Sequence, residues 1–325
     1  MRAVVCRDLA GVAGLSLERR PLPDPGPGKV RIRVRAAGVN FADTLVIEGK
    51  YQEKPALPFV PGFEVAGRID AIGAGVDADL EGARVLAVIA SGGYADHALA
   101  PASDVVRLTD AIDEVTAAGF AIAYGSSHGA LRWEARLQPG ETLVVHGASG
   151  GVGLAAVECG KAMGARVIAT CRGVEKGRLA REKGADHVLD TDTDDLVARI
   201  KKLTEGRGAD VVFDPVGKSV EEASLRGLGF GGRWLVVGFA GGGVPALPAN
   251  ILLVKNLAVH GFNWGGHRRH QPGRVAEGLT ELLAWHGEGR LRPHVSHRVP
   301  LADYARALDL LRSRTSTGKV VLTMT

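Results

Sequence analysis

The segment ETLVVHGASGGVGLAAVECGKAMG, residues 141–164, decides the fold class of this chain. It begins with apolar, β-branched residues typical of a buried strand and continues into an apolar stretch of helical length. A turn of small residues, Gly147-Ala148-Ser149-Gly150-Gly151-Val152-Gly153, separates the two. A strand, a glycine-rich turn and a helix in this order form the first part of a βαβ unit.

The same rhythm continues downstream of this segment. Helices are expected at 175–184, 195–206 and 220–228, and they alternate with short apolar strands at 165–171, 187–190, 210–217, 233–238 and 257–262. Parallel strands need crossover connections, so this alternation predicts an α/β fold with a Rossmann-type, doubly wound parallel sheet.

The rest of the chain follows a different pattern. The first 120 or so residues indicate a β-rich domain, in which KVRIRVRAAGV at 29–39 alternates like a strand. After residue 262 we expect a loop, NWGGHRRHQPGR, then a helix at 275–285, and finally a helix and strand at 301–324 that return to the first domain. The predicted domains are therefore 1–122 with 263–325, and 123–262.

Composition limits the classes of function. Of the 325 residues, 46% are hydrophobic and 23% are charged, and no apolar run is long enough to span a membrane. The first residues do not have the layout of a signal peptide, so a cytoplasmic location is expected. The three cysteines form no CxxC pair, which argues against a disulfide framework or a Cys-rich zinc site. The net charge of +4 comes from scattered arginines and suits an anionic ligand rather than nucleic acid.

The glycine-rich turn has the features of a dinucleotide site. Such a site needs a tight turn, a close approach of backbone to pyrophosphate, and a small residue where helix and strand meet. Gly150 and Gly153 suit the second and third roles, while Ala148 stands where the first glycine of the fingerprint is usual. We therefore expect Ser149, Gly150, Gly151, Val152 and Gly153 to contact the cofactor, with helix N–H groups facing its phosphates.

The end of the next strand indicates which dinucleotide is bound. An NAD site usually carries an acidic residue there, roughly 20 residues past the turn. Here the strand ends at Thr170-Cys171-Arg172, with Lys176 one helical turn later. Arg172 can bind a 2′-phosphate bidentately and Lys176 can add a point charge, which favours NADPH. The competing interpretation is two solvated surface cations, and Glu175 is available to pair with either.

A second motif overlaps the turn. Gly147-Ala148-Ser149-Gly150-Gly151 also matches the G-x-S-x-G nucleophile elbow of α/β-hydrolases. That hypothesis makes Ser149 a nucleophile, with His294 or His297 as its base. It leaves Gly153 and the cationic strand end unexplained, so the dinucleotide interpretation is preferred.

Two further motifs lie in the first domain. They are Ala37-Gly38-Val39-Asn40-Phe41-Ala42-Asp43 and Pro61-Gly62-Phe63-Glu64-Val65-Ala66-Gly67. Together with the AxGGVG turn, they resemble the quinone oxidoreductase branch of the medium-chain dehydrogenase/reductase superfamily, over essentially the whole chain. The resemblance implies a GroES-like catalytic domain, a Rossmann domain, and a homodimer joined through the last Rossmann strand.

The resemblance also bears on metal and catalysis. Zinc-dependent relatives carry Cys in the first motif and His in the second, where this chain has Asn40 and Phe63, so no zinc is expected.

Chemistry then rests on positioning NADPH against a quinone or an enone. The resemblance places Asn40, Asp43 and Tyr51 at the reacting centre, with Tyr51 as a hydrogen-bond or proton donor. Alternatively, Tyr51 is a packed loop residue and Asp43 caps a helix. A second tyrosine found in many members is Leu45 here, so a two-tyrosine mechanism is not expected.

The same resemblance places further side chains along the cofactor: Ser126, Phe239, Phe262, Asn263 and, at the adenosine phosphate end, Arg314.

A competing function is a 2-enoyl-CoA reductase acting on acryloyl- or crotonyl-CoA, because Arg268-Arg269-His270 can meet a coenzyme A phosphate. A more distant alternative is a non-catalytic NADPH-binding protein. Because no basic stripe with interleaved aromatic residues occurs, no nucleic-acid partner is expected.

Overall fold

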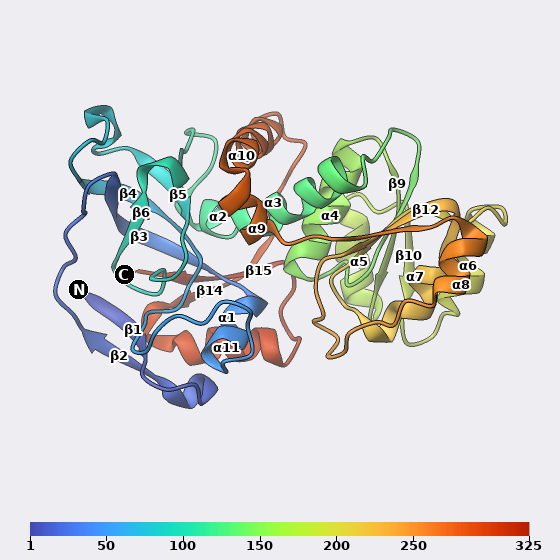
Figure 1. Cartoon of the computed structure of the whole chain (residues 1–325), viewed down its shortest axis with the longest axis horizontal. Helices are drawn as coiled ribbons and strands as arrows, with labels where there is room; N and C mark the ends of the chain where they lie inside the picture. Colours follow the sequence, from blue (N-terminus) through green and yellow to red (C-terminus); the bar gives the residue numbers. More distant parts are fainter. Residues whose placement is uncertain (325) are drawn as a thin grey trace. The chain divides into compact units, whose positions relative to one another are not determined.

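The computed structural model describes residues 1–324. The chain forms two compact units (Figure 1). The first contains Met1–Ile122 and the chain from Pro293 onward, and the second contains Ala123–Arg292. Among the described residues, no helix has both the length and the apolar character needed to cross a membrane.

The second unit is built on a six-stranded sheet in the order β10-β9-β8-β11-β12-β13. All neighbouring strands run parallel. The strands are β8 (Thr142–Val145), β9 (Arg166–Cys171), β10 (His187–Asp190), β11 (Ala209–Asp214), β12 (Leu228–Val236) and β13 (Ala258–Gly261). This confirms the predicted doubly wound sheet. Its order reverses between β8 and β11, and in such folds ligands bind at the carboxyl ends of the strands beside that reversal.

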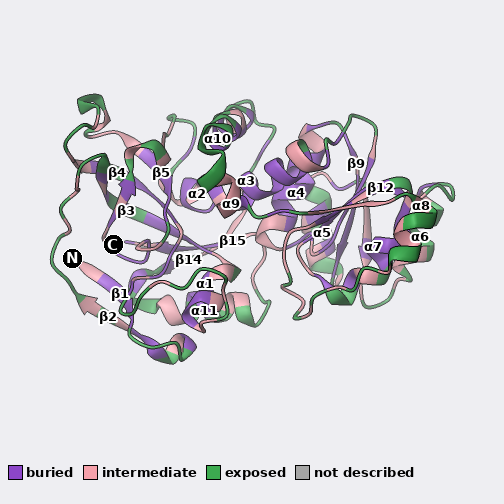
Figure 2. Cartoon of the chain, viewed as in Figure 1, coloured by how far each residue is buried: buried purple, intermediate pink, exposed green. Residues whose placement is uncertain are grey.

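Helices alternate with these strands. They are α4 (Gly151–Ala162), α5 (Val174–Glu182), α6 (Leu196–Leu203), α7 (Glu221–Gly227) and α8 (Ala249–Lys255). Figure 2 shows the sheet buried between helices whose outer faces are exposed. Trp234, Phe213 and Ile168 are among the largest fully buried side chains, as expected for strands covered on both faces.

Residues 263–292 differ from the sequence prediction in two respects. The expected loop is largely a short helix, α9 (Trp264–His270), because the Asn263 side chain caps it by accepting from the Gly266 N–H at 3.1 Å. A second helix, α10 (Pro272–Gly287), follows at once, with proline in its first turn. The segment also groups with the second unit rather than with the first. The reason is local packing, since Arg274 lies over the Trp133 ring, 4.7 Å from its centroid.

The first unit is built on a mostly antiparallel sheet in the order β14-β15-β3-β4-β5-β7, with β6 also paired to β3. Its strands are β3 (Lys29–Val39), β4 (Glu64–Ile72), β5 (Arg84–Val88), β6 (His97–Pro101), β7 (Val105–Arg107), β14 (Val295–Pro300) and β15 (Lys319–Thr323); β1 (Arg2–Cys6) and β2 (Leu15–Arg19) pair separately. The helices are α1 (Phe41–Ile47), α2 (Glu114–Ala118), α11 (Tyr304–Arg312) and, running across the boundary between the units, α3 (Ala121–Gly129).

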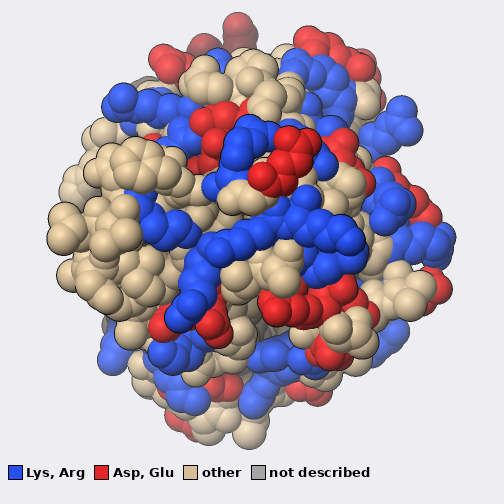
Figure 3. Space-filling model, turned by 90° about the vertical axis from the view of Figure 1, so that its right-hand side faces the viewer, with Lys and Arg blue, Asp and Glu red and all other residues tan. Residues whose placement is uncertain are grey.

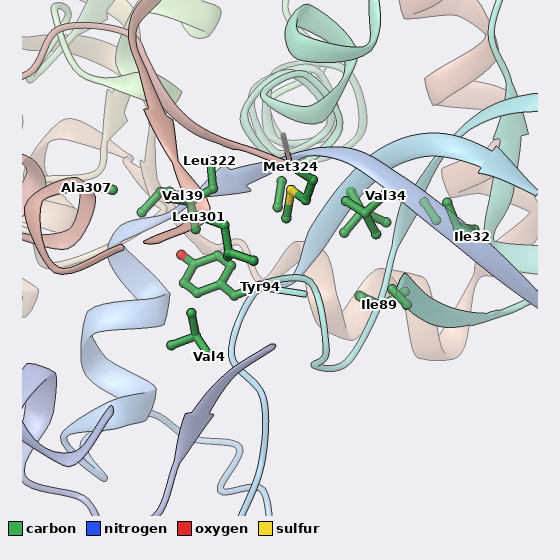
Figure 4. Packing of buried hydrophobic residues seen from close by; sticks show 14 of the residues in the cluster. Val4, Ile32, Val34, Val39, Ile89, Tyr94, Leu301, Ala307, Leu322 and Met324 are labelled. Atoms are coloured by element: carbon green, nitrogen blue, oxygen red, sulfur yellow. The ribbon is translucent and has the colours of Figure 1, made fainter. Parts of the chain in front are cut away.

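The C-terminal segment returns to this first unit, as predicted. β15 pairs antiparallel with β3, placing Val320 opposite Val39 and Leu322 opposite Ala37. One core joins both ends of the chain, because Val4, Tyr94, Leu301 and Leu322 belong to a single buried cluster (Figure 4). The C-terminal strand therefore stabilises the same sheet that carries the first functional motif.

Candidate functional site

The glycine-rich turn connects β8 to α4 at the reversal of the strand order. Gly147 has φ +59°, a left-handed conformation that glycine adopts without strain. The Ala148 N–H donates to the Thr170 carbonyl at 3.0 Å, which fastens the turn to the end of β9. Helix α4 begins at Gly151 without a side-chain cap. Its first backbone N–H groups therefore suit an anion held at a helix N-terminus.

Gly150 and Gly153 are glycines for different reasons. A Cβ at Gly153 would lie 2.2 Å from the Gly147 oxygen, so this position must lack a side chain for helix and turn to pack. A Cβ at Gly150 would meet only that same oxygen, at 3.5 Å, an ordinary contact. The fold itself therefore tolerates a side chain at position 150, and the absence of one leaves backbone open to a ligand.

Arg172 follows the end of β9, next to this turn in the sheet. Its Nε donates to the Asp192 carboxylate at 3.1 Å, and the side chains are 66% and 51% exposed, respectively. Asp192, which lies just past the end of β10, was not singled out from the sequence. An exposed pair of this kind contributes little to stability, so Arg172 has no strong structural role.

The neighbouring charges on α5 are arranged differently from the sequence expectation. Glu175 pairs with Arg178, at 3.1 Å, a partner that the sequence did not indicate. Lys176 is half-buried in the first turn of α5, and Val174 beside it is 82% exposed. The end of β9 and the start of α5 thus present a cationic surface with an apolar residue next to it.

The structure brings other predicted cofactor residues to the same carboxyl edge of the sheet. Phe239 lies beyond the end of β12, 40% exposed, and Phe262 directly follows β13. Phe262 is buried and stacks on His267 with a centroid separation of 4.9 Å. Asn263 caps α9, and Ser126 is buried on α3. Phe262 and Asn263 therefore have structural roles whether or not they contact a cofactor.

Asn40 and Asp43 lie at the start of α1 in the first unit. Asn40 is the N-cap of α1, and its backbone N–H donates to Oδ2 of Asp43 at 2.7 Å, so Asp43 supports the cap from the third helical position. The Tyr94 hydroxyl donates to the same oxygen at 2.8 Å, while Oδ1 is buried with no hydrogen-bond partner. Burial raises the pKa of Asp43 to about 7, although these hydrogen bonds and the nearby Lys319 ammonium oppose the rise. Burial likewise raises the pKa of Tyr94.

The Asn40 side chain belongs to a buried ionic network. Glu64, at the start of β4, and Lys319, at the start of β15, are 1% and 6% exposed, and their charged atoms lie 2.9 Å apart. Asn40 bonds to both of them. Gly38 makes room for this network, because a Cβ there would lie 2.3 Å from Glu64 Oε1. Sequence reasoning missed Glu64 and Lys319, although a charged residue in an otherwise apolar strand signals a buried partner.

Tyr51 and Arg314 are the remaining predicted residues of the first unit. Tyr51 is half-buried after α1 and packs against Phe63, with ring centroids 5.9 Å apart. Arg314 is exposed just after α11, with φ +56°. Tyr51 also packs against the core cluster of the first unit, so it has a packing role whether or not it meets an acceptor.

A zinc ion does not fit the residues present. Asn40 and Phe63 stand at the positions of the zinc ligands, and the Lys319 ammonium already neutralises Glu64. Within residues 1–324, no group of three or more His, Cys, Asp and Glu side chains is placed to hold a metal ion. No step that uses a metal is derived for this site.

Comparison with known proteins defines the family. The alcohol dehydrogenase GroES-like domain matches residues 26–110, and the zinc-binding dehydrogenase domain matches residues 151–284. Quinone oxidoreductase-like protein 2 homolog of Nematostella vectensis is 38% identical over 88% of this chain and 79% of its own length. The chain belongs to the quinone oxidoreductase branch of the medium-chain dehydrogenase/reductase superfamily. It is thus an oxidoreductase, and the hydrolase interpretation of Ser149 is wrong.

Solved structures of this family agree with the fold. Quinone oxidoreductase of Escherichia coli, complexed with NADPH, has a TM-score of 0.93 and 30% identity, covering 99% of this chain and 100% of that one. Quinone oxidoreductase of Thermus thermophilus, described together with its NADPH complex, has a TM-score of 0.87 and 34% identity, and each chain is covered completely. The predicted GroES-like and Rossmann architecture is therefore confirmed.

Proposed function

We propose that this chain is an NADPH-dependent, zinc-independent oxidoreductase that transfers hydride to quinones or other conjugated carbonyl acceptors. The observation that carries the proposal is the glycine-rich turn at the strand-order reversal, with Arg172 at the end of the adjacent strand. The relatives whose structures were solved in complex with NADPH support the choice of cofactor.

Residues of the second unit are proposed to hold the cofactor. The backbone from Ser149 to Gly153 receives the pyrophosphate at the N-terminus of α4. Arg172 keeps its two Nη nitrogens for the 2′-phosphate because its bond to Asp192 uses Nε. Lys176 adds positive charge. Ser126, Phe239, Phe262, Asn263 and, from the first unit, Arg314 are proposed to line the rest of the cofactor.

Residues of the first unit are proposed to act on the acceptor. Bound NADPH supplies a hydride, which forms a C–H bond to the acceptor while an electron pair moves onto the carbonyl oxygen. Asn40 and Tyr51 donate hydrogen bonds to that oxygen, and Tyr51 or solvent delivers the proton that completes the reduction. Asp43 holds the backbone of Asn40 in place.

Removal of the Arg172 cation tests the cofactor assignment. Arg172→Ala removes a charge-assisted hydrogen bond worth about 1.5–3 kcal/mol, so the KM for NADPH should rise about 10- to 100-fold. The KM for NADH should change little. Arg178→Ala, at another exposed, ion-paired arginine of the same region, is the matched control. Equal losses with NADPH and NADH would refute the role of Arg172.

A homodimer is also proposed, joined through the edge of the Rossmann sheet. β13 ends the strand order, and α8 just before it carries Leu253 and Val254, which are 81% and 76% exposed. An open strand edge beside exposed apolar side chains is typical of a surface covered by a second copy. Leu253→Glu should shift the mass measured by light scattering from dimer to monomer. A monomeric wild-type chain would refute the proposal.

The charge on the outer face of this unit gives no support to a nucleic-acid partner. Figure 3 shows the side on which α6 and α8 lie, with Lys and Arg interspersed with Asp and Glu. Several of these charges are paired, as in Arg226 with Glu222 at 3.1 Å and Arg199 with Asp194 at 3.6 Å. A basic surface that binds nucleic acid carries an unbalanced positive charge, whereas acidic side chains lie beside the Lys and Arg of this face.

A further inference from the structure

The buried Glu64–Lys319 pair controls the orientation of the Asn40 amide. Lys319 Nζ donates to Asn40 Oδ1 at 2.7 Å, and Asn40 Nδ2 donates to Glu64 Oε1 at 2.9 Å. An ammonium only donates and a carboxylate only accepts, so the amide cannot be reversed without losing both bonds. The assignment of nitrogen and oxygen at Asn40 is therefore fixed by the chemistry of its neighbours.

The charged groups of Glu64 and Lys319 are themselves fully hydrogen-bonded. Lys319 Nζ also donates to the Val39 carbonyl at 3.1 Å and to Glu64 Oε1 at 2.9 Å, so its three hydrogens have three acceptors. Glu64 Oε2 accepts from the Ile122 backbone N–H at 2.9 Å. A satisfied network at low exposure is rigid, whereas a partly satisfied one would be costly. Asn40 bonds to both charged residues but is itself only half-buried, so the network fixes the orientation of a side chain that is partly exposed.

We propose that Glu64 and Lys319 are positioning residues for acceptor reduction, acting through Asn40. Glu64 accepts one Nδ2 hydrogen of Asn40, which leaves the second for the acceptor, and Lys319 keeps the side-chain oxygen of Asn40 hydrogen-bonded. The acceptor oxygen gains negative charge as hydride adds to the acceptor, so it is stabilised by an N–H donor and repelled by a carbonyl. This inference rests on the proposed function, because it assumes that Asn40 meets the acceptor.

Replacement of the pair as a unit tests the inference. Lys319→Met with Glu64→Gln removes both charges together, so neither member of the pair is left buried without the other. We expect kcat with a quinone to fall about 10- to 100-fold, while the Kd for NADPH, measured by fluorescence, stays within about twofold. Arg31→Met with Asp70→Asn, at a 2.8 Å ion pair of the same sheet that does not bond to Asn40, is the matched control and should keep kcat.

A mutant cycle separates positioning from a general structural effect. If the pair acts only through Asn40, the triple variant, which combines Asn40→Ala with the double variant, should have the same kcat as Asn40→Ala alone. Additive losses, or a double variant that keeps the wild-type kcat, would overturn the inference while the proposed function stands. A wild-type chain that reduces no acceptor would overturn both.

A milder variant serves if the double variant does not fold. Glu64→Asp keeps the opposite charges but withdraws the carboxylate by one methylene group, which weakens its hold on Asn40. We expect kcat to fall about tenfold. Full activity of Glu64→Asp would contradict the inference.

Discussion

The buried carboxylate of Asp43 makes the stability of the first unit depend on pH. Asp43 Oδ2 accepts from Tyr94 and from the Asn40 N–H, whereas Oδ1 has no partner. Asp43→Asn removes the titrating group with little change in shape. The amide oxygen can accept both existing bonds, so the variant retains the local contacts.

The size and sign of the effect follow from the pKa values. Burial raises the pKa of Asp43 from 3.8 to about 7. Between these values the folded chain keeps a proton that the unfolded chain has released, so raising the pH favours unfolding. At about 1.4 kcal/mol for each pH unit, the linkage amounts to about 4 kcal/mol. This stabilisation is fully present below the unfolded pKa and is lost as the pH rises through about 7.

Chemical denaturation of wild type and Asp43→Asn at several pH values measures this linkage. The unfolding free energy of wild type minus that of Asp43→Asn should fall as the pH rises, by about 1.4 kcal/mol per unit, and level off above about pH 7. Asp24→Asn, at a fully exposed carboxylate, controls for the loss of one negative charge. Tyr94→Phe should raise the pH at which this difference levels off, because the Tyr94 hydrogen bond lowers the pKa of Asp43. A difference that is independent of pH would refute the reasoning.

Four further substitutions separate folding from function. Gly150→Ala should fold normally and weaken NADPH binding about tenfold or more, whereas Gly153→Ala, whose Cβ meets backbone at 2.2 Å, should lower the melting temperature as well; equal melting losses would contradict this. Tyr51→Phe should lower kcat about tenfold with an unchanged Kd for NADPH, and an unchanged kcat would make Tyr51 a packing residue. Gly38→Ala should destabilise the chain by about 2 kcal/mol or more, measured against Gly26→Ala, where a Cβ meets nothing within 4 Å.

The Rossmann sheet was predictable because its signals are local. The strands between 142 and 261 and helices α4 to α7 are marked by their own apolar patterns, whereas α8 (Ala249–Lys255) was not predicted. Helix α9 was missed because WGGHRRH has no apolar period and begins with two glycines after its tryptophan. Its cap, Asn263, was interpreted as a cofactor residue instead.

The network around Asn40 was not predictable in the same way. Glu64 and Lys319 are 255 positions apart, and they come together because β3 pairs with both β4 and β15. A capping role for Asp43 was predicted, although the N-cap is Asn40 and Asp43 supports it from the first turn, whereas the contact of Asp43 with Tyr94 depends on the packed core. Local chemistry can be inferred from one sequence, but buried charge pairing requires the topology.

The measurement that tests the central claim most directly is cofactor oxidation by the pure, chelator-treated protein. NADPH and NADH are each offered with 1,4-benzoquinone, 9,10-phenanthrenequinone and crotonyl-CoA. The account predicts quinone-dependent oxidation of NADPH, much weaker use of NADH, and no effect of the chelator. Crotonyl-CoA as the best acceptor would replace the quinone assignment with an enoyl-thioester reductase. Preference for NADH, loss of activity with chelator, or NADPH binding without any turnover would contradict the account.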